Sequence, residues 1–404
     1  MPCGGLARVL AGLARRGHHG AMFTDGAAAF HAPAGGALLH AGHALRPVIG
    51  RQRVAARQGI LLILLTAAIA QPAGDKVATL PNRNGYVTSR QDVRLFWRAF
   101  DAGDYGLRYR YARPRHEGGE PVDMDLRLEP PRPFHARAPR GTVVLLHGWM
   151  MSGDAMLPWS LQLAQSGYRV ITIDLRNHGH SGGGPAGYGT VESDEVIDVI
   201  RALRARGEVQ GPLYLFGVSY GGATALFTAE KLGGDVQGVV AMESFANAGD
   251  AIRSMIPHLL ASEPHGWQAQ AVAAYARWRY ADQDMDAVIA AANRRLGVDL
   301  DQVDVSRAVA ASHACVLLLH GDQDQHIRVD QGRRLAQASP RAHYIEMRGE
   351  DHITLPMRID LLGGIVDDWM SRDVSAPDGL CPAPRLPLEA NFMALAQGVG
   401  GSNG

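Results

Sequence analysis

Short, continuous runs of apolar residues alternate with helical patterns, and this alternation constrains the fold of the chain more than any other feature of its sequence. The apolar runs lie at 142–146, 169–173, 213–216, 236–242, 315–319 and 343–347. Such runs are typical of strands that are buried on both faces of a parallel sheet. Apolar residues recur at helical spacing between most of the runs, over 155–165, 193–206, 223–232 and 329–338. Strand and helix alternate, so the sequence predicts an α/β fold with a mostly parallel sheet covered by helices on both faces.

The remaining segments predict how the chain is divided. Residues 107–111 and 122–128 alternate apolar and polar positions, as half-buried antiparallel strands do, and we expect them to form one edge of the sheet. A core is predicted over 75–246 and 315–370, interrupted by a helical cap at 247–314. Two helical patterns, 272–280 and 287–296, and the aromatic residues Trp267, Tyr275 and Trp278 lie in this cap. The segment 371–404 has several Pro and Gly residues and no period, so we expect a loosely ordered tail.

The first 70 residues differ from the rest and are expected to lie outside the fold. Arg51, Arg53 and Arg57 precede the apolar run 59–70, whose last residues Ala68-Ile69-Ala70 fit the small-x-small cleavage rule. This pattern predicts a signal peptide and export to the periplasm or the medium. The run is shorter than the roughly 20 residues that span a bilayer, so a stable membrane span is not expected. The alternative is a protein anchored by the uncleaved segment.

Charge and cysteine content exclude several classes of function. Lys and Arg together number 40, as do Asp and Glu, so no net field attracts nucleic acid. The three cysteines, Cys3, Cys315 and Cys381, show no metal-ligand spacing. We therefore expect no metal site, no disulfide framework and no nucleic-acid partner. Cys315 begins an apolar run and is expected to be a core residue.

A candidate nucleophile lies between an apolar run and an Ala-rich helical pattern. Gly217-Val-Ser219-Tyr-Gly221 fits the G-x-S-x-G pattern, in which the serine lies on a sharp turn from strand to helix. Ser181 fits the same pattern in Gly179-His-Ser-Gly-Gly183, but it follows its strand by several residues and precedes glycines rather than a helix. Ser219 is therefore the predicted nucleophile.

A serine hydroxyl needs a base, which a third group must orient. Asp322 and Asp324 follow the apolar run 315–319, and His352 follows the run 343–347. Loops after parallel strands meet at one edge of a sheet, so these groups can converge on Ser219. The order Ser, Asp, His is the one that accompanies this serine turn.

Between about 122 and 370 the chain resembles the serine hydrolase branch of the α/β-hydrolase superfamily, which includes esterases, lipases and serine aminopeptidases. The resemblance rests on His147-Gly-Trp149, on Asp174-Leu-Arg-Asn-His-Gly-His-Ser181, on the serine turn, on His320-Gly-Asp-Gln-Asp324 and on Gly349-Glu-Asp-His352. It implies a sheet of the eight-stranded type and no cofactor.

For the site, the resemblance implies that Asp324 rather than Asp322 is the acid and that His352 is the base. Asp322 and Glu243 remain alternatives for the acid. The resemblance also implies an oxyanion hole made by the backbone N–H groups of Tyr220 and Trp149. Met150, next to this hole, and Glu243 are expected to contact the substrate, and His147 is expected to brace the oxyanion turn.

The expected activity is hydrolysis of a carboxylic ester, or a related acyl bond of a small molecule, through an acyl-enzyme intermediate. A serine peptidase is the first alternative. A catalytically inactive binding protein of the same fold is the second. The sequence does not fix the group that flanks the carbonyl, and it gives no oligomeric state.

Overall fold

The computed structural model describes residues 80–112, 123–261, 284–372, 381–387 and 392–394, with isolated positions at 270, 274 and 277. Its main sheet has nine strands, and its smaller sheet has two. The order in the main sheet is β1 (Arg83–Thr88), β2 (Arg94–Phe100), β6 (Arg169–Ile173), β5 (Thr142–Leu146), β7 (Leu213–Val218), β8 (Gly238–Met242), β9 (Cys315–Gly321), β10 (Ala342–Met347) and β11 (Phe392–Ala394). Strands β6, β5, β7, β8, β9 and β10 are parallel. The predicted mostly parallel α/β sheet is confirmed.

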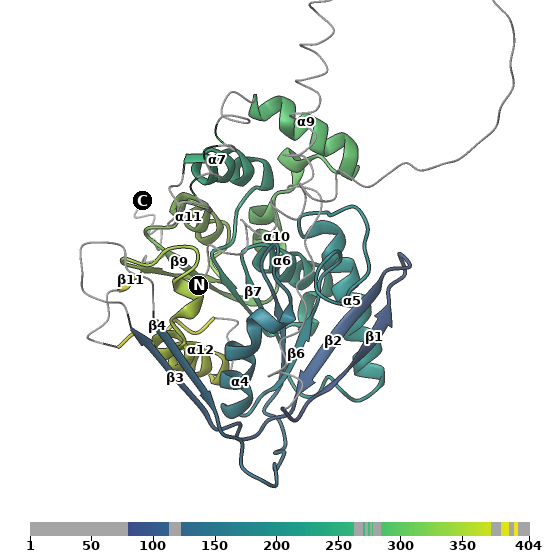
Figure 1. The fold of residues 1–404 in the computed structure, drawn as a ribbon, viewed down its shortest axis with the longest axis vertical. Helices are drawn as coiled ribbons and strands as arrows, with labels where there is room; N and C mark the ends of the chain where they lie inside the picture. Colours follow the sequence, from purple (N-terminus) through teal and green to yellow (C-terminus); the bar gives the residue numbers. More distant parts are fainter. Residues whose placement is uncertain are drawn as a thin grey trace, which may run out of the picture.

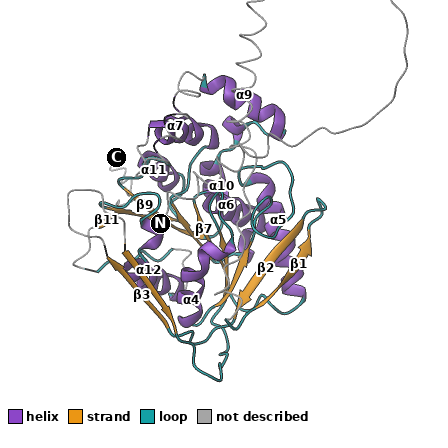
Figure 2. Cartoon of the chain, viewed as in Figure 1, coloured by secondary structure: helices purple, strands orange, loops and turns teal. Residues whose placement is uncertain are grey.

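Helices cover both faces of this sheet (Figures 1 and 2). One face is covered by α5 (Thr190–Ala205), α6 (Tyr220–Leu232), α10 (Val305–Ala311) and α11 (Val329–Gln337), and the other by α4 (Leu157–Gln165) and α12 (Ile359–Ser371). Successive strand residues point to opposite faces, so Val144 and Leu146 of β5 enter the first core while Val143 and Leu145 enter the second. Both cores need apolar residues, which explains the unbroken apolar runs of the central strands.

The edge of the main sheet differs from the prediction. The two alternating segments form a separate antiparallel pair, β3 (Leu107–Ala112) and β4 (Asp123–Leu128), instead of an edge of the main sheet. The edge is made by β1 and β2: β1 pairs antiparallel with β2, and β2 pairs antiparallel with β6. Alternation indicates a half-buried strand but does not identify its neighbour, and β2 is buried at every position after Arg94. The β3–β4 pair packs on the second core, where the Tyr109 hydroxyl donates a 2.5 Å hydrogen bond to Met357 O.

Helices connect β8 to β9, as expected for the segment 247–314. They are α7 (Ala248–Ala261), α9 (Met285–Leu296), the 3-10 turn η3 (Leu300–Gln302) and α10. Figure 1 shows α7 and α9 next to each other at the end of the molecule away from β3 and β4. The three aromatic residues expected in the cap, and most of the pattern at 272–280, lie outside the described residues. The other 3-10 turns are η1 (Gly153–Met156), η2 (Gly233–Asp235) and η4 (Leu355–Met357).

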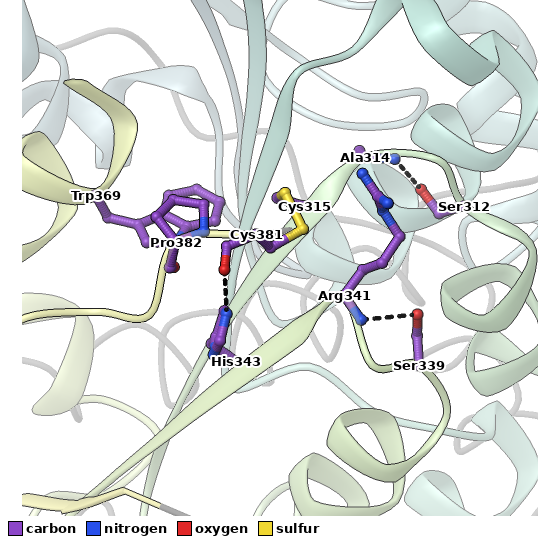
Figure 3. The surroundings of a disulfide bond; sticks show 9 residues. All are labelled: Ser312, Ala314, Cys315, Ser339, Arg341, His343, Trp369, Cys381 and Pro382. Atoms are coloured by element: carbon purple, nitrogen blue, oxygen red, sulfur yellow. Dashed lines mark hydrogen bonds between the residues drawn. A yellow bond between two sulfur atoms is a disulfide. The ribbon is translucent and has the colours of Figure 1, made fainter. Parts of the chain in front are cut away.

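The C-terminal segment is attached to the core at several points, in contrast to the loose tail expected for it. Cys315 forms a disulfide with Cys381 (Figure 3), so the expectation of no disulfide is wrong. Nearby, His343 Nε2 lies 3.0 Å from Cys381 O, and the Trp369 indole donates to Pro382 O over 2.8 Å. Strand β11 extends the sheet beside β10. The two cysteines are 66 residues apart in the sequence, so a search for short cysteine spacings does not find this pair.

Among the residues that the structure describes, we find no helix with the length and apolar character needed to cross a membrane. The apolar run at 59–70 lies outside those residues.

Candidate active site

Ser219 lies on a sharp turn between β7 and α6. Its backbone has φ 53° and ψ −116°, a conformation that side chains with a Cβ rarely adopt. The turn lifts the partly exposed serine above the end of the strand. A residue held in this way, where the surrounding structure enforces the strain, is typical of a functional position.

The two glycines of the motif allow this turn because the backbone approaches them closely. A Cβ on Gly217 would lie 2.1 Å from Gly221 O, and one on Gly221 would lie 2.2 Å from Leu146 O. Real Cβ atoms do not come this close to an oxygen. The glycines therefore let β7, the first turn of α6 and the end of β5 pack together under Ser219.

Hydrogen bonds between neighbouring strands bring the other candidate residues to the same edge of the sheet. The Ser219 N–H donates to Met242 O at the end of β8 over 2.7 Å. The Glu243 N–H in turn donates to Leu319 O of β9 over 2.9 Å. The loop that carries Asp324 follows β9, and the loop that carries His352 follows β10.

Asp324 and His352 form a hydrogen-bonded pair. His352 Nδ1 lies 2.7 Å from Asp324 Oδ2. Asp324 is 2% exposed, and its Oδ1 accepts the backbone N–H groups of His326 and Ile327 over 2.8 and 2.9 Å. Burial alone raises the pKa of this carboxyl group, but the neighbouring His320 and the hydrogen-bonded His352 outweigh burial and hold the pKa below its ordinary value. Asp324 is therefore an ionised acid oriented towards His352.

The two alternative acids make other contacts. Asp322 accepts the Gly349 N–H over 2.7 Å, a contact that joins the loop after β9 to the loop after β10. Glu243 is 0% exposed and accepts the Gly321 N–H over 3.1 Å. Glu243 therefore lies behind Asp324, and not on a surface open to the substrate that we expected it to contact.

The link between Ser219 and His352 is not closed by a hydrogen bond. Among the described residues, no hydrogen bond joins the Ser219 hydroxyl to the imidazole of His352. The sheet brings the two residues to the same edge, and their pairing stays a prediction.

The turn after β5, which carries Trp149 and Met150, is held by two buried histidines. His147 Nε2 accepts the Leu175 N–H over 3.0 Å, and its Nδ1 donates to Gly148 O over 2.8 Å. His178 Nε2 accepts the Met150 N–H over 3.1 Å, and its Nδ1 donates to Arg176 O over 2.7 Å. Burial lowers the pKa of His147 to about 4 and, together with the nearby His147, the pKa of His178 to about 3. Both rings are therefore neutral near pH 7. Their hydrogen bonds hold the turn after β5 in place, as expected for His147.

Ser181, the second match to the serine pattern, has a structural role. Its hydroxyl donates to Asp174 O over 2.5 Å and accepts the Phe96 N–H over 2.8 Å. The Asp174 carboxylate accepts the N–H groups of Gly153 and His180. Ser181 therefore fastens its loop to β2.

Aromatic contacts that the sequence patterns did not identify lie at the candidate site. His326 stacks on His352 with ring centroids 5.2 Å apart and an interplanar angle of 28°. Burial lowers the pKa of His326 to about 4, so the ring is neutral near pH 7. Trp149 stacks on Tyr188 at 5.5 Å and contacts Tyr220 edge-on at 4.9 Å. These contacts join segments far apart in the sequence, so no local pattern marks them.

One cluster has the composition of a metal site. Glu243, His320 and Asp324 are all buried, and one potential ligand atom from each lies within 4.8 Å of the others. However, His320 Nε2 lies 2.8 Å from Ile327 O. A carbonyl oxygen only accepts hydrogen bonds, so this nitrogen carries a proton and has no lone pair for a metal. The donor set does not fit a metal ion.

The chain is similar to known proteins in family and in fold. A family model described as "Alpha/beta hydrolase family" matches residues 143–358, more than half of the chain. An uncharacterised protein of Bacillus subtilis (strain 168), YqkD, is 32% identical over 88 residues, which are 22% of this chain and 29% of that protein. The chain thus matches less than a third of that relative's length.

Two solved structures illustrate the structural likeness. The Pyrococcus furiosus esterase Pf2001 has a TM-score of 0.50 and 15% identity, with 76% of this chain and 98% of that chain covered. The enol-lactonase of Burkholderia xenovorans LB400 has a TM-score of 0.46 and 20% identity, with 71% and 100% covered. At this identity the esterase shows a shared fold alone.

Proposed function

The chain belongs to the alpha/beta hydrolase family, and we propose that it is a serine hydrolase that cleaves carboxylic esters through an acyl-enzyme intermediate. The observation that carries this proposal is the 2.7 Å hydrogen bond between His352 Nδ1 and Asp324 Oδ2, at the sheet edge that also holds Ser219 in its strained turn. A hydrogen-bonded base and acid at the same sheet edge as a partly exposed serine are the parts that acyl transfer requires.

Each residue has a defined role in the proposed reaction. Ser219 Oγ attacks the carbonyl carbon of the substrate while His352 Nε2 takes the hydroxyl proton. His352 then gives this proton to the leaving alkoxide, which departs as an alcohol. A water molecule, deprotonated by His352, attacks the acyl-enzyme, and His352 returns the proton to Ser219 Oγ as the carboxylic acid is released. Asp324 holds the imidazole with Nδ1 protonated and stabilises the cation that forms at each step.

Backbone N–H groups would stabilise the tetrahedral intermediate. The first is that of Tyr220, at the start of α6, and the second is that of Trp149, in the turn braced by His147 and His178. The removal of one such donor typically raises the barrier by about 3 to 4 kcal/mol. The rigid turn supports this role because a donor must be in place before charge develops on the oxygen.

Apolar side chains near the site favour an ester with an apolar group. Among the described residues, the exposed large hydrophobic side chains are Met151, at 38%, and Ile353, at 44%. Met151 follows the oxyanion turn and Ile353 follows the candidate base. Exposed apolar side chains next to the oxyanion turn and next to the candidate base support contact with an alkyl chain. The shared fold with an esterase agrees with this substrate class but does not select it.

A fluorophosphonate probe tests the proposal because it reacts with an activated serine and does not require a known substrate. Labelling is expected for the wild type and for Ser181→Ala, and not for Ser219→Ala. Ser181→Ala is a matched control because both serines fit the same sequence pattern. An unlabelled wild type would favour a binding protein, and labelling of Ser219→Ala would exclude Ser219 as the nucleophile. p-Nitrophenyl esters of increasing chain length, beside aminoacyl p-nitroanilides, then separate an esterase from a peptidase.

We also propose that the protein is exported. The disulfide between Cys315 and Cys381 supports this proposal because such bonds persist mainly in oxidising compartments. The basic residues and apolar run at 51–70 support it independently. Expression of the full chain followed by cell fractionation and N-terminal sequencing tests it. Recovery from the cytoplasm with Met1 intact would exclude export by this segment.

A further inference from the structure

Glu243 is a buried acid at the edge of the sheet, next to the candidate triad. It directly follows β8, has φ 52° and is 0% exposed. A non-glycine residue in the left-handed region and a carboxyl group away from water both cost folding free energy. These costs call for a compensating contact of the side chain.

The two oxygens of Glu243 have different surroundings. Oε1 accepts the Gly321 N–H over 3.1 Å, whereas Oε2 is buried and has no hydrogen-bond donor. His320 Nε2 lies 3.3 Å from Oε2, but its proton is directed to Ile327 O. The same nitrogen lies 3.4 Å from Asp324 Oδ2, so His320 lies beside both carboxyl groups, whose facing oxygens are within 4.8 Å of each other. An oxygen without a donor, directed at another carboxylate, is best satisfied when it carries a proton itself.

The count of donors shows which of the two acids keeps the proton. Asp324 accepts three N–H groups, from His326, Ile327 and His352, whereas Glu243 accepts one. Hydrogen bonds to a carboxylate stabilise its charged form, and two adjacent buried carboxylates cannot both ionise at low cost. Burial, followed by the contact with Asp324, raises the pKa of Glu243 well above its ordinary value.

We propose that Glu243 is a positioning residue of the triad, whose protonated carboxyl group donates a hydrogen bond from Oε2 to the Asp324 carboxylate. Its role rests on the proposed function, since it acts through Asp324 on His352. The bond gives Asp324 a second side-chain donor in addition to His352. It thereby keeps one lone pair of Asp324 directed at Nδ1 of the imidazole.

The decisive variant is Glu243→Gln. Its amide NH₂ can donate to Asp324 as the protonated acid does, while its oxygen still accepts the Gly321 N–H. We expect the rate of fluorophosphonate labelling to stay within about threefold of wild type, with an unchanged midpoint of the acid limb between pH 5 and 8. Glu243→Met fills a similar volume but donates nothing. It is expected to label about 10- to 100-fold more slowly, the rate equivalent of one hydrogen bond to a charged group.

Other outcomes would overturn the inference. A loss of labelling in Glu243→Gln as deep as that in Asp324→Asn would make Glu243 itself the ionised triad acid. A shift of the acid limb to lower pH by about one unit in Glu243→Gln would also mean that the native side chain is an anion, because the variant removes a charge. Wild-type labelling by a folded Glu243→Met would show that no positioning bond exists. The titratable groups that interact with the Glu243 carboxyl group are Asp324, His320, Asp351 and Tyr344.

A measurement independent of activity separates this inference from the proposed function. Infrared difference spectra between wild type and Glu243→Gln at pH 7 report the carbonyl stretch of a protonated carboxylic acid. The band is expected in wild type and not in the variant. Its absence in wild type overturns the inference even if Ser219 is labelled. If the band is present in a wild-type protein that the probe does not label, Glu243 is protonated as inferred. In that case only the proposed function is refuted.

Discussion

The backbone N–H of Met150 donates a hydrogen bond to Nε2 of His178 over 3.1 Å. Met150 has φ 61°, so the turn after β5 depends on an external partner to hold its shape. The partner comes from the loop after β6, and the next residue towards the strand, Trp149, carries a proposed oxyanion donor.

Loss of the acceptor at residue 178 is expected to slow catalysis. His178→Phe keeps a ring but removes the nitrogen that accepts the Met150 N–H, so kcat should fall about 10- to 100-fold with little change in KM, as for a misplaced catalytic group. In His178→Gln the side-chain oxygen can still accept the N–H, and we expect kcat near that of wild type. Steady-state kinetics with a p-nitrophenyl ester measures both. Equal rates for the Phe variant and wild type would contradict the role of this brace.

The free energy of unfolding at acid pH should depend on His147 and His178. His147 and His178 have folded pKa values of about 4 and about 3, below the ordinary 6.5 of the unfolded chain. The unfolded state therefore takes up more protons between these values. The resulting stability is present above pH 6.5 and is lost as the pH falls towards 4 and 3, by up to about 1.4 kcal/mol per pH unit for each group. Urea unfolding of wild type and His178→Gln from pH 7 to 4.5 checks this, and the variant should lose less stability. An equal loss of unfolding free energy in both proteins over this pH range would refute the prediction.

Substitution of the two aspartates after β9 should have very different effects on kcat. Asp324→Asn removes the carboxylate that orients His352, and a fall in kcat of about 10⁴-fold is expected for a wrongly oriented tautomer. Asp322→Asn keeps an oxygen that can accept the Gly349 N–H, so its kcat should stay within a few fold of wild type. The same ester assay compares them. A larger loss in Asp322→Asn would reverse the assignment of the acid.

The close approach at Gly221 predicts a large effect on stability. A Cβ there would lie 2.2 Å from Leu146 O, and the backbone of β5 or α6 would have to move. Gly221→Ala is expected to lower the free energy of unfolding by about 3 kcal/mol or more. Gly234→Ala is the control, because a Cβ at Gly234 meets nothing within 4 Å. Thermal and urea unfolding compare the two, and similar stabilities would show that the turn can relax.

The disulfide should stabilise the protein through the long segment that it closes. The two cysteines are 66 residues apart, and closure of such a loop corresponds to about 4 kcal/mol of lost chain entropy in the unfolded state. Cys381→Ala should therefore lower Tm, and a reductant should lower the Tm of wild type but not that of the variant. A Tm of wild type that does not respond to complete reduction would contradict this contribution.

Several features of the protein follow from local sequence. The six parallel strands could be predicted because a strand buried on both faces needs an unbroken apolar run, as at Thr142–Leu146. Ser219 was distinguishable from Ser181 because its motif lies between a strand and a helix. Asp324 and His352 could be placed at the same edge because both follow parallel strands.

Tertiary structure decided the contacts between segments that are distant along the chain. The sequence could not show that β3 and β4 form their own sheet, because alternation specifies burial on one face and not the partner strand. It could not pair Cys315 with Cys381, or stack His326 on His352. Glu243 could be placed near the site from its position after a predicted strand, but its burial behind Asp324 depends on three neighbouring strands. Residue type and local period determine which elements form, whereas the environment of each side chain, and with it the protonation state, arises only when those elements pack.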